Sequence, residues 1–143
     1  PGEINRTRYE PRGVAAIISP WNFPLAILAG MTGAALVTGN CAIMKPATPA
    51  LILAHRFHAV LLEAGFPAAV CQLLPGAGSS VGGHLVRHPG IDIVAFTGSR
   101  EVGLAIIEQA SRLAPGQTHL KSVVCEMGGK NAIIVDADAD PDE

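Results

Sequence analysis

The sequence predicts an α/β protein with a doubly wound, mostly parallel sheet and helices on both faces. Short apolar, β-branched segments alternate along the chain with longer segments that carry helix start and stop signals. The apolar segments are continuous rather than alternating, which is typical of strands buried on both sides. We expect strands at residues 13–19, 41–45, 70–74, 91–97, 122–127 and 132–136.

The first helix with clear end signals is expected over residues 48–65. Thr48 is its expected N-cap, Pro49 suits the first turn, and Gly65 suits the left-handed position that follows a helix. No repeat, low-complexity tract or interdomain linker divides the 143 residues, so we expect one domain.

The second helix is expected to begin after Ser99, which has the side chain of an N-cap residue. Glu101 falls in the first turn, where the helix dipole favours a negative charge. The helix is expected to end before Pro115, since proline cannot continue it.

The composition excludes several classes of function. The formal net charge is −2 and no cluster of Lys and Arg occurs, so neither nucleic acid nor an anionic membrane is an expected partner. The longest apolar stretches are interrupted by glycine and are shorter than the roughly 20 residues of a membrane span. Charged residues make up only 15% of the chain, against roughly 25% in typical soluble domains, which indicates a piece of a larger body.

The thiols and imidazoles indicate neither a disulfide framework nor a metal site. Cys41, Cys71 and Cys125 are odd in number, lack CxxC spacing and lie in apolar segments, which favours buried thiols in a reducing cytosol or matrix. We expect a cytoplasmic protein. His84 and His88 are four residues apart, but no third ligand has suitable spacing, so no metal is expected.

Polar or glycine residues follow five successive predicted strands, with the motifs PWNFP, MKPA, PGAGSSVGG, FTGS and EMGGKN. In doubly wound sheets the carboxyl ends of the strands form the ligand-binding edge. Val81 stands where GxGxxG requires its third glycine, and no GxxxxGK[ST] motif occurs, which argues against a P-loop ATPase. Taken singly, Lys45 also suits a surface lysine, and Glu126 suits an ion pair at a sheet edge.

Together and in this order, the motifs resemble the cofactor-binding domain of an NAD(P)-dependent aldehyde dehydrogenase, from about Tyr9 to the end of the chain. The segments RYEPRGVAAIISPWNFPLAI and APGQTHLKSVVCEMGGKNAIIVDADAD are similar to the branch that acts on 1-pyrroline-5-carboxylate, or L-glutamate γ-semialdehyde. That branch includes stand-alone enzymes and the dehydrogenase part of bifunctional proline-utilisation proteins. The resemblance implies NAD as cofactor, a small aldehyde as substrate and a homo-oligomeric parent protein.

By position, the resemblance implies catalytic roles for two residues. Asn22 would donate a hydrogen bond to the developing oxyanion, and Glu126 would be the base that activates water to hydrolyse the acyl-enzyme thioester. Burial of Glu126 in its apolar strand would raise the carboxyl pKa toward the working pH. The implied cofactor-binding residues are Ser19, Pro20, Trp21, Lys45, Ala47, Thr48, Gly78, Gly82, Phe96, Thr97, Gly98, Ser99, Val102, Gly103, Met127 and Gly128.

Two departures from the family pattern limit what the chain is expected to do alone. The family's nucleophilic cysteine lies beyond the glutamate motif, and none of the three cysteines fits that role. We therefore expect residues 1–143 to be an NAD(P)-binding domain fragment that lacks the catalytic-cysteine domain and the oligomerisation arm and is inactive alone. Thr48 stands near the position of a glutamate that contacts the ribose in many members, so NAD is expected on subfamily grounds only.

Three other interpretations remain open from the sequence. The parent enzyme can be an aldehyde dehydrogenase of another substrate class, because the residues that select the substrate lie mostly outside this chain. A non-catalytic dinucleotide-binding module would share the glycine loops, but it would not need both Asn22 and Glu126. A structural or interaction fragment would match the low charge content.

Overall fold

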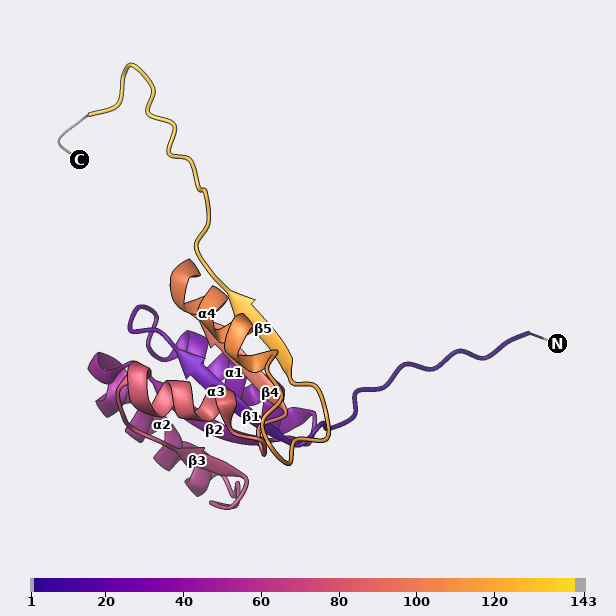
Figure 1. Ribbon diagram of the computed structural model, residues 1–143. Coiled ribbons are helices and arrows are strands. Elements are labelled where there is room, and N and C mark those ends of the chain that lie inside the picture. Colours follow the sequence, from indigo (N-terminus) through magenta and orange to yellow (C-terminus); the bar gives the residue numbers. More distant parts are fainter. Residues whose placement is uncertain (1, 141–143) are drawn as a thin grey trace.

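The computed structural model describes residues 2–140, which form a five-stranded sheet in which every neighbouring pair of strands is parallel. The strand order is β3-β2-β1-β4-β5 (Figure 1). After β3 the chain returns to the other side of β1, where β4 and then β5 extend the sheet. The predicted doubly wound fold is therefore confirmed. The strands are β1 (Val14–Ser19), β2 (Cys41–Pro46), β3 (Cys71–Leu73), β4 (Ile93–Thr97) and β5 (Ser122–Glu126).

Helices cover both faces of the sheet, α1 and α2 on one side and α3 and α4 on the other (Figure 1). Within residues 2–140 no helix is long and apolar enough to cross a membrane. The helices are α1 (Ala26–Val37), α2 (Leu51–Glu63), α3 (Gly83–Arg87) and α4 (Arg100–Ala110), with a 3-10 turn at Thr48–Ala50 and a π-helical turn at Gly78–Gly82.

The central strand β1 supplies side chains to both apolar layers, because successive residues of a strand point to opposite faces. Ile17 is 1% exposed and packs in the layer under α1 and α2. Ala16 and Ile18 belong to the layer under α3 and α4, together with Phe96. Burial on both faces explains why the sequence of β1 is continuously apolar.

The first predicted helix is present, but it does not start as expected. Ala47, with an extended backbone, occupies the cap position of the 3-10 turn that precedes α2, and no side chain caps it. Thr48 is therefore not the N-cap. Pro49 has no N–H group, so the first turn contains one donor fewer to satisfy. Gly65 follows α2 with φ +93°, as predicted.

The second predicted helix agrees with its end signals. The Ser99 hydroxyl accepts a hydrogen bond from the Val102 amide at 3.3 Å, and Glu101 lies in the first turn. The helix ends at Ala110, ahead of Pro115.

Two helices are present where none was predicted. Helix α1 forms in an apolar, glycine-containing segment and has no side-chain cap. Helix α3 follows a π-helical turn in the segment that we interpreted as a glycine loop. Both lack the polar end signals on which sequence-based prediction depends.

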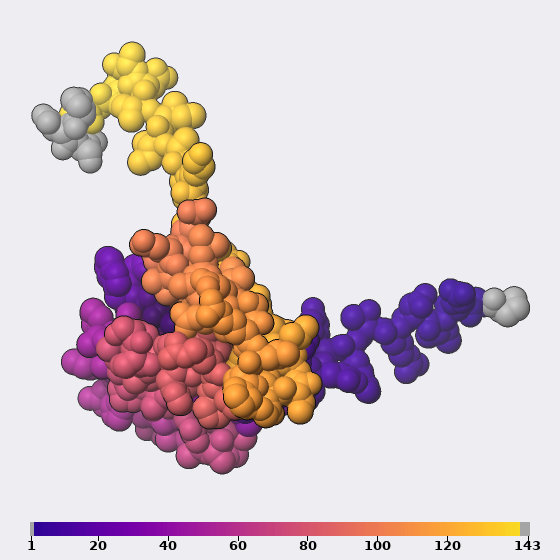
Figure 2. Space-filling model, viewed as in Figure 1, coloured from indigo at the N-terminus to yellow at the C-terminus, as the bar shows by residue number. Residues whose placement is uncertain are grey.

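The sixth predicted strand, residues 132–136, is wrong. Ile133 and Ile134 are 90% and 93% exposed, and the segment after β5 leaves the body of the protein, as residues 2–11 do on another side (Figures 1 and 2). A strand needs a neighbour for its backbone hydrogen bonds, and no described strand lies beside this segment. The sheet is also not covered on both faces at β5, where Val124 is 57% exposed.

We expect Ile17→Ala to lower the free energy of unfolding by roughly 2–5 kcal/mol, because it removes buried methyl groups from the middle of the sheet. Ile52→Ala is the matched control, since Ile52 is 83% exposed on α2 and its truncation should change stability little. Urea unfolding followed by circular dichroism measures both. Equal midpoints for the two variants would contradict the placement of Ile17.

Candidate functional site

The carboxyl ends of β1, β4 and β5 surround a cavity of about 480 Å³, here called the strand-end cavity. It lies where the chain changes direction in the sheet, between β1 and β4, the position at which open α/β sheets bind ligands. Its volume falls in the usual range for small-molecule sites. Most predicted site residues line it: Ser19, Pro20, Trp21, Asn22, Phe96, Thr97, Gly98, Ser99, Val102, Met127 and Gly128.

Ser19 ends β1 at the wall of this cavity and leaves a polar group unsatisfied. The residue is 4% exposed, and its hydroxyl has no hydrogen-bond partner among the described residues. An unsatisfied buried hydroxyl costs roughly 1–3 kcal/mol, so such groups usually have a partner. The oxygen is itself buried, so it does not open into the cavity, and only the residue as a whole forms part of the wall.

Two glycines let helix α4 start close to the strand ends. A Cβ atom at Gly98 would lie 2.6 Å from the Phe96 ring, and one at Gly103 would lie 2.6 Å from the Met127 sulfur. The amino-terminal turn of α4 therefore forms part of the cavity wall. Its backbone dipoles favour a negatively charged ligand group.

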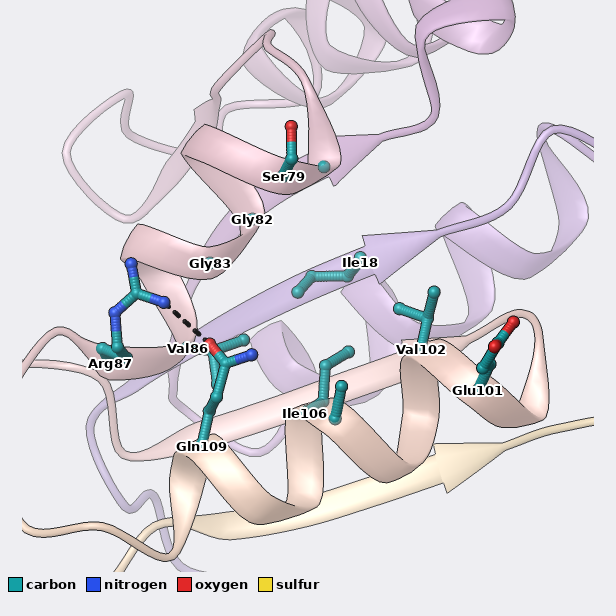
Figure 3. Close-up of a pocket in the computed structure, with 12 residues that line it drawn as sticks. Ile18, Ser79, Gly82, Gly83, Val86, Arg87, Glu101, Val102, Ile106 and Gln109 are labelled. Carbon is teal, nitrogen blue, oxygen red and sulfur yellow. Dashed lines mark hydrogen bonds between the residues drawn. The ribbon is translucent and has the colours of Figure 1, made fainter.

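A second cavity of about 410 Å³ lies between α3 and α4 and is here called the interhelix cavity (Figure 3). Val86 and Ile106 make its walls apolar, and Arg87 Nη1 donates a 2.8 Å hydrogen bond to Gln109 Oε1 across one side. Val102 lines both cavities. The full lining is Ile18, Gly78, Ser79, Gly82, Gly83, Val86, Arg87, Glu101, Val102, Ala105, Ile106 and Gln109.

Lys45 is buried at the end of β2, which excludes the alternative of a surface lysine. It is 4% exposed, and its ammonium group donates to the Pro46 carbonyl at 3.2 Å. A Cβ atom at Gly82 would lie at an ordinary contact distance of 3.9 Å from the Lys45 stem, so the two residues are close neighbours. Burial lowers the pKa of Lys45, because an ammonium loses hydration there.

Glu126 ends β5, but its side chain is exposed and lines neither cavity. Its backbone carbonyl accepts a hydrogen bond from Gly98 at 3.1 Å, and it pairs with Thr97 in the sheet. The expectation of a buried carboxyl is wrong for this chain, because nothing among residues 2–140 covers that face of β5. The described residues also offer Glu126 no ion-pair partner.

The other predicted site residues lie outside the cavities. Ala47 and Thr48 follow β2 and line neither cavity, and Thr48 is exposed. Within residues 2–140 no three His, Cys, Asp or Glu side chains gather in a way that could hold a metal ion. His84 and His88 contact each other with ring centroids 5.4 Å apart.

No thiol faces either cavity. Cys71 is fully buried in β3, and burial raises its pKa. Cys125 points toward α4, with its sulfur 3.9 Å from the Gly103 carbonyl, and burial raises its pKa too. Cys41 starts β2, at the opposite end of that strand from Lys45. The prediction of buried core thiols is therefore right for Cys71, whereas Cys41 and Cys125 are only partly buried.

Of the residues that line the interhelix cavity, the sequence analysis named Gly78, Gly82 and Val102 as site residues and missed the others. Val102 and Ile106 are one turn apart on α4, so the period of that helix could have indicated a shared face. Val86 and Arg87 had no such signal, because α3 itself was not predicted.

Comparison with known proteins agrees with this architecture. A model of the aldehyde dehydrogenase family matches residues 1–143. The chain belongs to that family. Over 140 residues it is 55% identical to 1-pyrroline-5-carboxylate dehydrogenase from Geobacillus thermodenitrificans, covering 98% of this chain and 27% of that relative. The chain thus spans about a quarter of the length of the aldehyde dehydrogenases that it resembles.

Solved structures of family members have the same fold. Proline utilization A from Bdellovibrio bacteriovorus matches with a TM-score of 0.86 and 52% identity, over 94% of this chain and 14% of that one. The 1-pyrroline-5-carboxylate dehydrogenase from Thermus with bound NAD matches with a TM-score of 0.82 and 49% identity, over 84% and 23%.

We expect Cys71 and Cys125 to react with a disulfide reagent at pH 8 at least about tenfold more slowly than a free cysteine. Burial raises the pKa of each thiol, which lowers the fraction of reactive thiolate, and it also restricts access of the reagent. Reaction with Ellman's reagent, mapped by mass spectrometry, measures each site, and the urea-unfolded chain is the control. A fast-reacting native thiol at neutral pH would show that one of them is an activated nucleophile.

Proposed function

We propose that this chain is the NAD-binding part of an aldehyde dehydrogenase that oxidises L-glutamate γ-semialdehyde (1-pyrroline-5-carboxylate) to glutamate. The observation that carries the proposal is the pair of cavities that meet at Val102, at the carboxyl ends of β1 and β4. The names of the relatives and the Thermus structure with bound NAD support the substrate and the cofactor.

The cavities suit the parts of a dinucleotide. The apolar interhelix cavity suits the adenine ring, and Lys45 with Gly82 beside it suits the adenosine ribose. The amino-terminal turn of α4 suits the diphosphate, because its dipoles favour negative charge. The strand-end cavity, beside Asn22 and the ends of β4 and β5, suits the nicotinamide end. When bound, NAD supplies a hydride acceptor for the aldehyde carbon.

Two residues of this chain would take part in the chemistry. The Asn22 side chain lines the strand-end cavity, where its amide can donate to an oxyanion. The Glu126 carboxyl would take a proton from the water that hydrolyses a thioester. The thioester itself needs a nucleophilic cysteine from another part of the protein. That part would also cover the open face of β5 and so remove Glu126 from water.

The proposal has consequences for the whole protein. Residues 1–143 would be an NAD(P)-binding domain fragment, of which residues 1 and 141–143 lie outside the described part. A catalytic-cysteine domain and an oligomerisation arm would complete a cytoplasmic homo-oligomer. An aldehyde dehydrogenase for another substrate class is the second candidate, because no described residue has been shown to select the substrate.

Filling the junction of the two cavities should weaken cofactor binding. We expect Val102→Phe to raise the dissociation constant for NADH roughly tenfold or more, because the larger ring occupies space needed by the ligand. Leu104→Phe is the matched control: both residues lie on α4, 49% and 45% exposed, but Leu104 lines neither cavity.

Trp21 provides the measurement of this binding. It is the only tryptophan in the chain and it lines the strand-end cavity, so bound NADH should quench its emission by energy transfer. Equal dissociation constants for the two variants, or no saturable quenching in the unmodified chain, would contradict the proposed cofactor site.

The deacylation role is testable in a longer protein that contains this chain and turns over glutamate γ-semialdehyde with NAD. We expect Glu126→Gln to lower steady-state turnover by roughly 10²–10⁴-fold while leaving an initial burst of NADH, since an amide cannot accept the proton from water. Glu63→Gln, an exposed carboxyl at the end of α2, is the control.

Residues 1–143 alone should give no NADH in the same assay, because no thiol of this chain faces either cavity. Undiminished turnover of Glu126→Gln would remove the assigned base. Turnover by residues 1–143 would disprove the need for a second part of the protein.

A further inference from the structure

At the edge of the sheet opposite the cavities, one carboxylate, that of Asp92, contacts both β1 and the segment before β5. One oxygen of Asp92 accepts a hydrogen bond from the Val14 amide at 2.7 Å, and the other lies 2.9 Å from Nε2 of His119. The Asp92 side chain is only 19% exposed. This carboxylate therefore joins the start of β1, the start of β4 and the connection that leads into β5.

Gly13 is required by the position of that carboxylate. Its φ is +134°, and a Cβ atom there would lie 2.1 Å from Asp92 Oδ2. The chain thus keeps a side chain away from this point so that Asp92 can reach the Val14 amide. Such a close approach is typical of a fixed contact rather than of a loosely placed surface carboxylate.

The connection from α4 to β5 is fixed to the same place by further contacts. Lys121 donates to the His88 carbonyl, and the charge of Asp92 partly offsets the lowering of the Lys121 pKa by burial. Gln117 donates to the His119 carbonyl at 2.6 Å. The Ser122 amide, the first of β5, donates to the Asp92 carbonyl at 2.9 Å. These contacts determine where β5 starts.

The sequence of β5 specifies its own register weakly. Val123 and Cys125 pack toward α4, whereas Val124 faces the open side, so apolar residues occur on both faces. A shift by one residue would place Val124 where Cys125 now lies and Val123 where Val124 now lies. Two residues would be poorly suited, Ser122 in the place of Val123 and Glu126 in the place of Met127 beside Gly103. The pattern of apolar residues fixes the register of a strand only where one face of the strand is apolar and the other is polar.

The register of β5 determines the position of the carboxyl at its other end. In the observed register Thr97 pairs with Glu126. After the one-residue shift Cys125 would lie beside Thr97, and Glu126 would lie beyond the sheet on the opposite face.

We propose that Asp92 and His119 set the register of β5 on β4 and thereby act as positioning residues for Glu126. The importance of this for catalysis rests on the proposed role of Glu126. The register itself does not depend on that role. The contact between Asp92 and His119 lies at the amino-terminal end of the five-residue strand β5, and Glu126 lies at the other end.

The test compares variants of the whole chain by NMR, using contacts between backbone protons of β4 and β5. In the unmodified chain Phe96 should contact Cys125, and Thr97 should contact Glu126. In Asp92→Ala and in His119→Ala we expect a second set of contacts, Phe96 with Val124 and Thr97 with Cys125. We also expect amide exchange in β5 to be about tenfold faster or more, since a hydrogen bond to a charged group is lost.

Two further variants separate positioning from general loss of stability. His119→Gln keeps a side-chain donor and should restore the single native set of contacts. His58→Ala removes a histidine whose Nε2 lies 3.0 Å from the Cys71 carbonyl, elsewhere in the fold, and should also keep the native set.

A single native set in both alanine variants, with exchange no faster than in His58→Ala, would overturn the proposal. Should Asp92→Ala not fold, His119→Ala decides, because the His119 side chain is 35% exposed and can be truncated without opening the core. The experiment needs neither cofactor nor substrate. Its failure would leave the proposed function intact, and a failure to bind NADH would leave the register proposal intact.

Discussion

The parallel pairing of β1 with both β2 and β4 is the constraint on which the rest of the structure depends. Because strand order reverses around β1, the connections that follow β1 and β4 leave to opposite faces of the sheet, and a hollow remains between them. The residues that end these strands, Ser19 and Thr97, both line the strand-end cavity. The strand-end cavity is therefore a consequence of the topology of the sheet.

Close packing at the strand ends gives that hollow its shape. Gly98 and Gly103 bring α4 against Phe96 and Met127, and the helix then presents its first turn to the cavity. At the opposite edge Gly13 makes room for the Asp92 carboxylate. The described part of the chain is thus closely packed around β1, whereas Val124 and residues 127–140 remain exposed.

Much of this could be predicted from the sequence, for identifiable physical reasons. Five of the six predicted apolar strands, the Ser99 cap and the left-handed Gly65 are local features that are present. Helices α1 and α3 have no side-chain caps, so packing against the sheet rather than local sequence determines them. The exposure of Glu126 and the absence of a strand at 132–136 could not be predicted from local sequence. Both depend on whether another element covers β5, and none of the described residues does so.

An NMR titration of the chain with NAD⁺ tests the central claim most directly, because it locates the ligand on the fold without requiring turnover. The account predicts saturable shift changes at the carboxyl ends of β1 and β4, around Ser19 and Gly98, and along the facing sides of α3 and α4. The amino-terminal edge, at Val14 and Asp92, should change little. Saturable changes centred on that edge, or none anywhere, would contradict the assignment of the two cavities as a dinucleotide site.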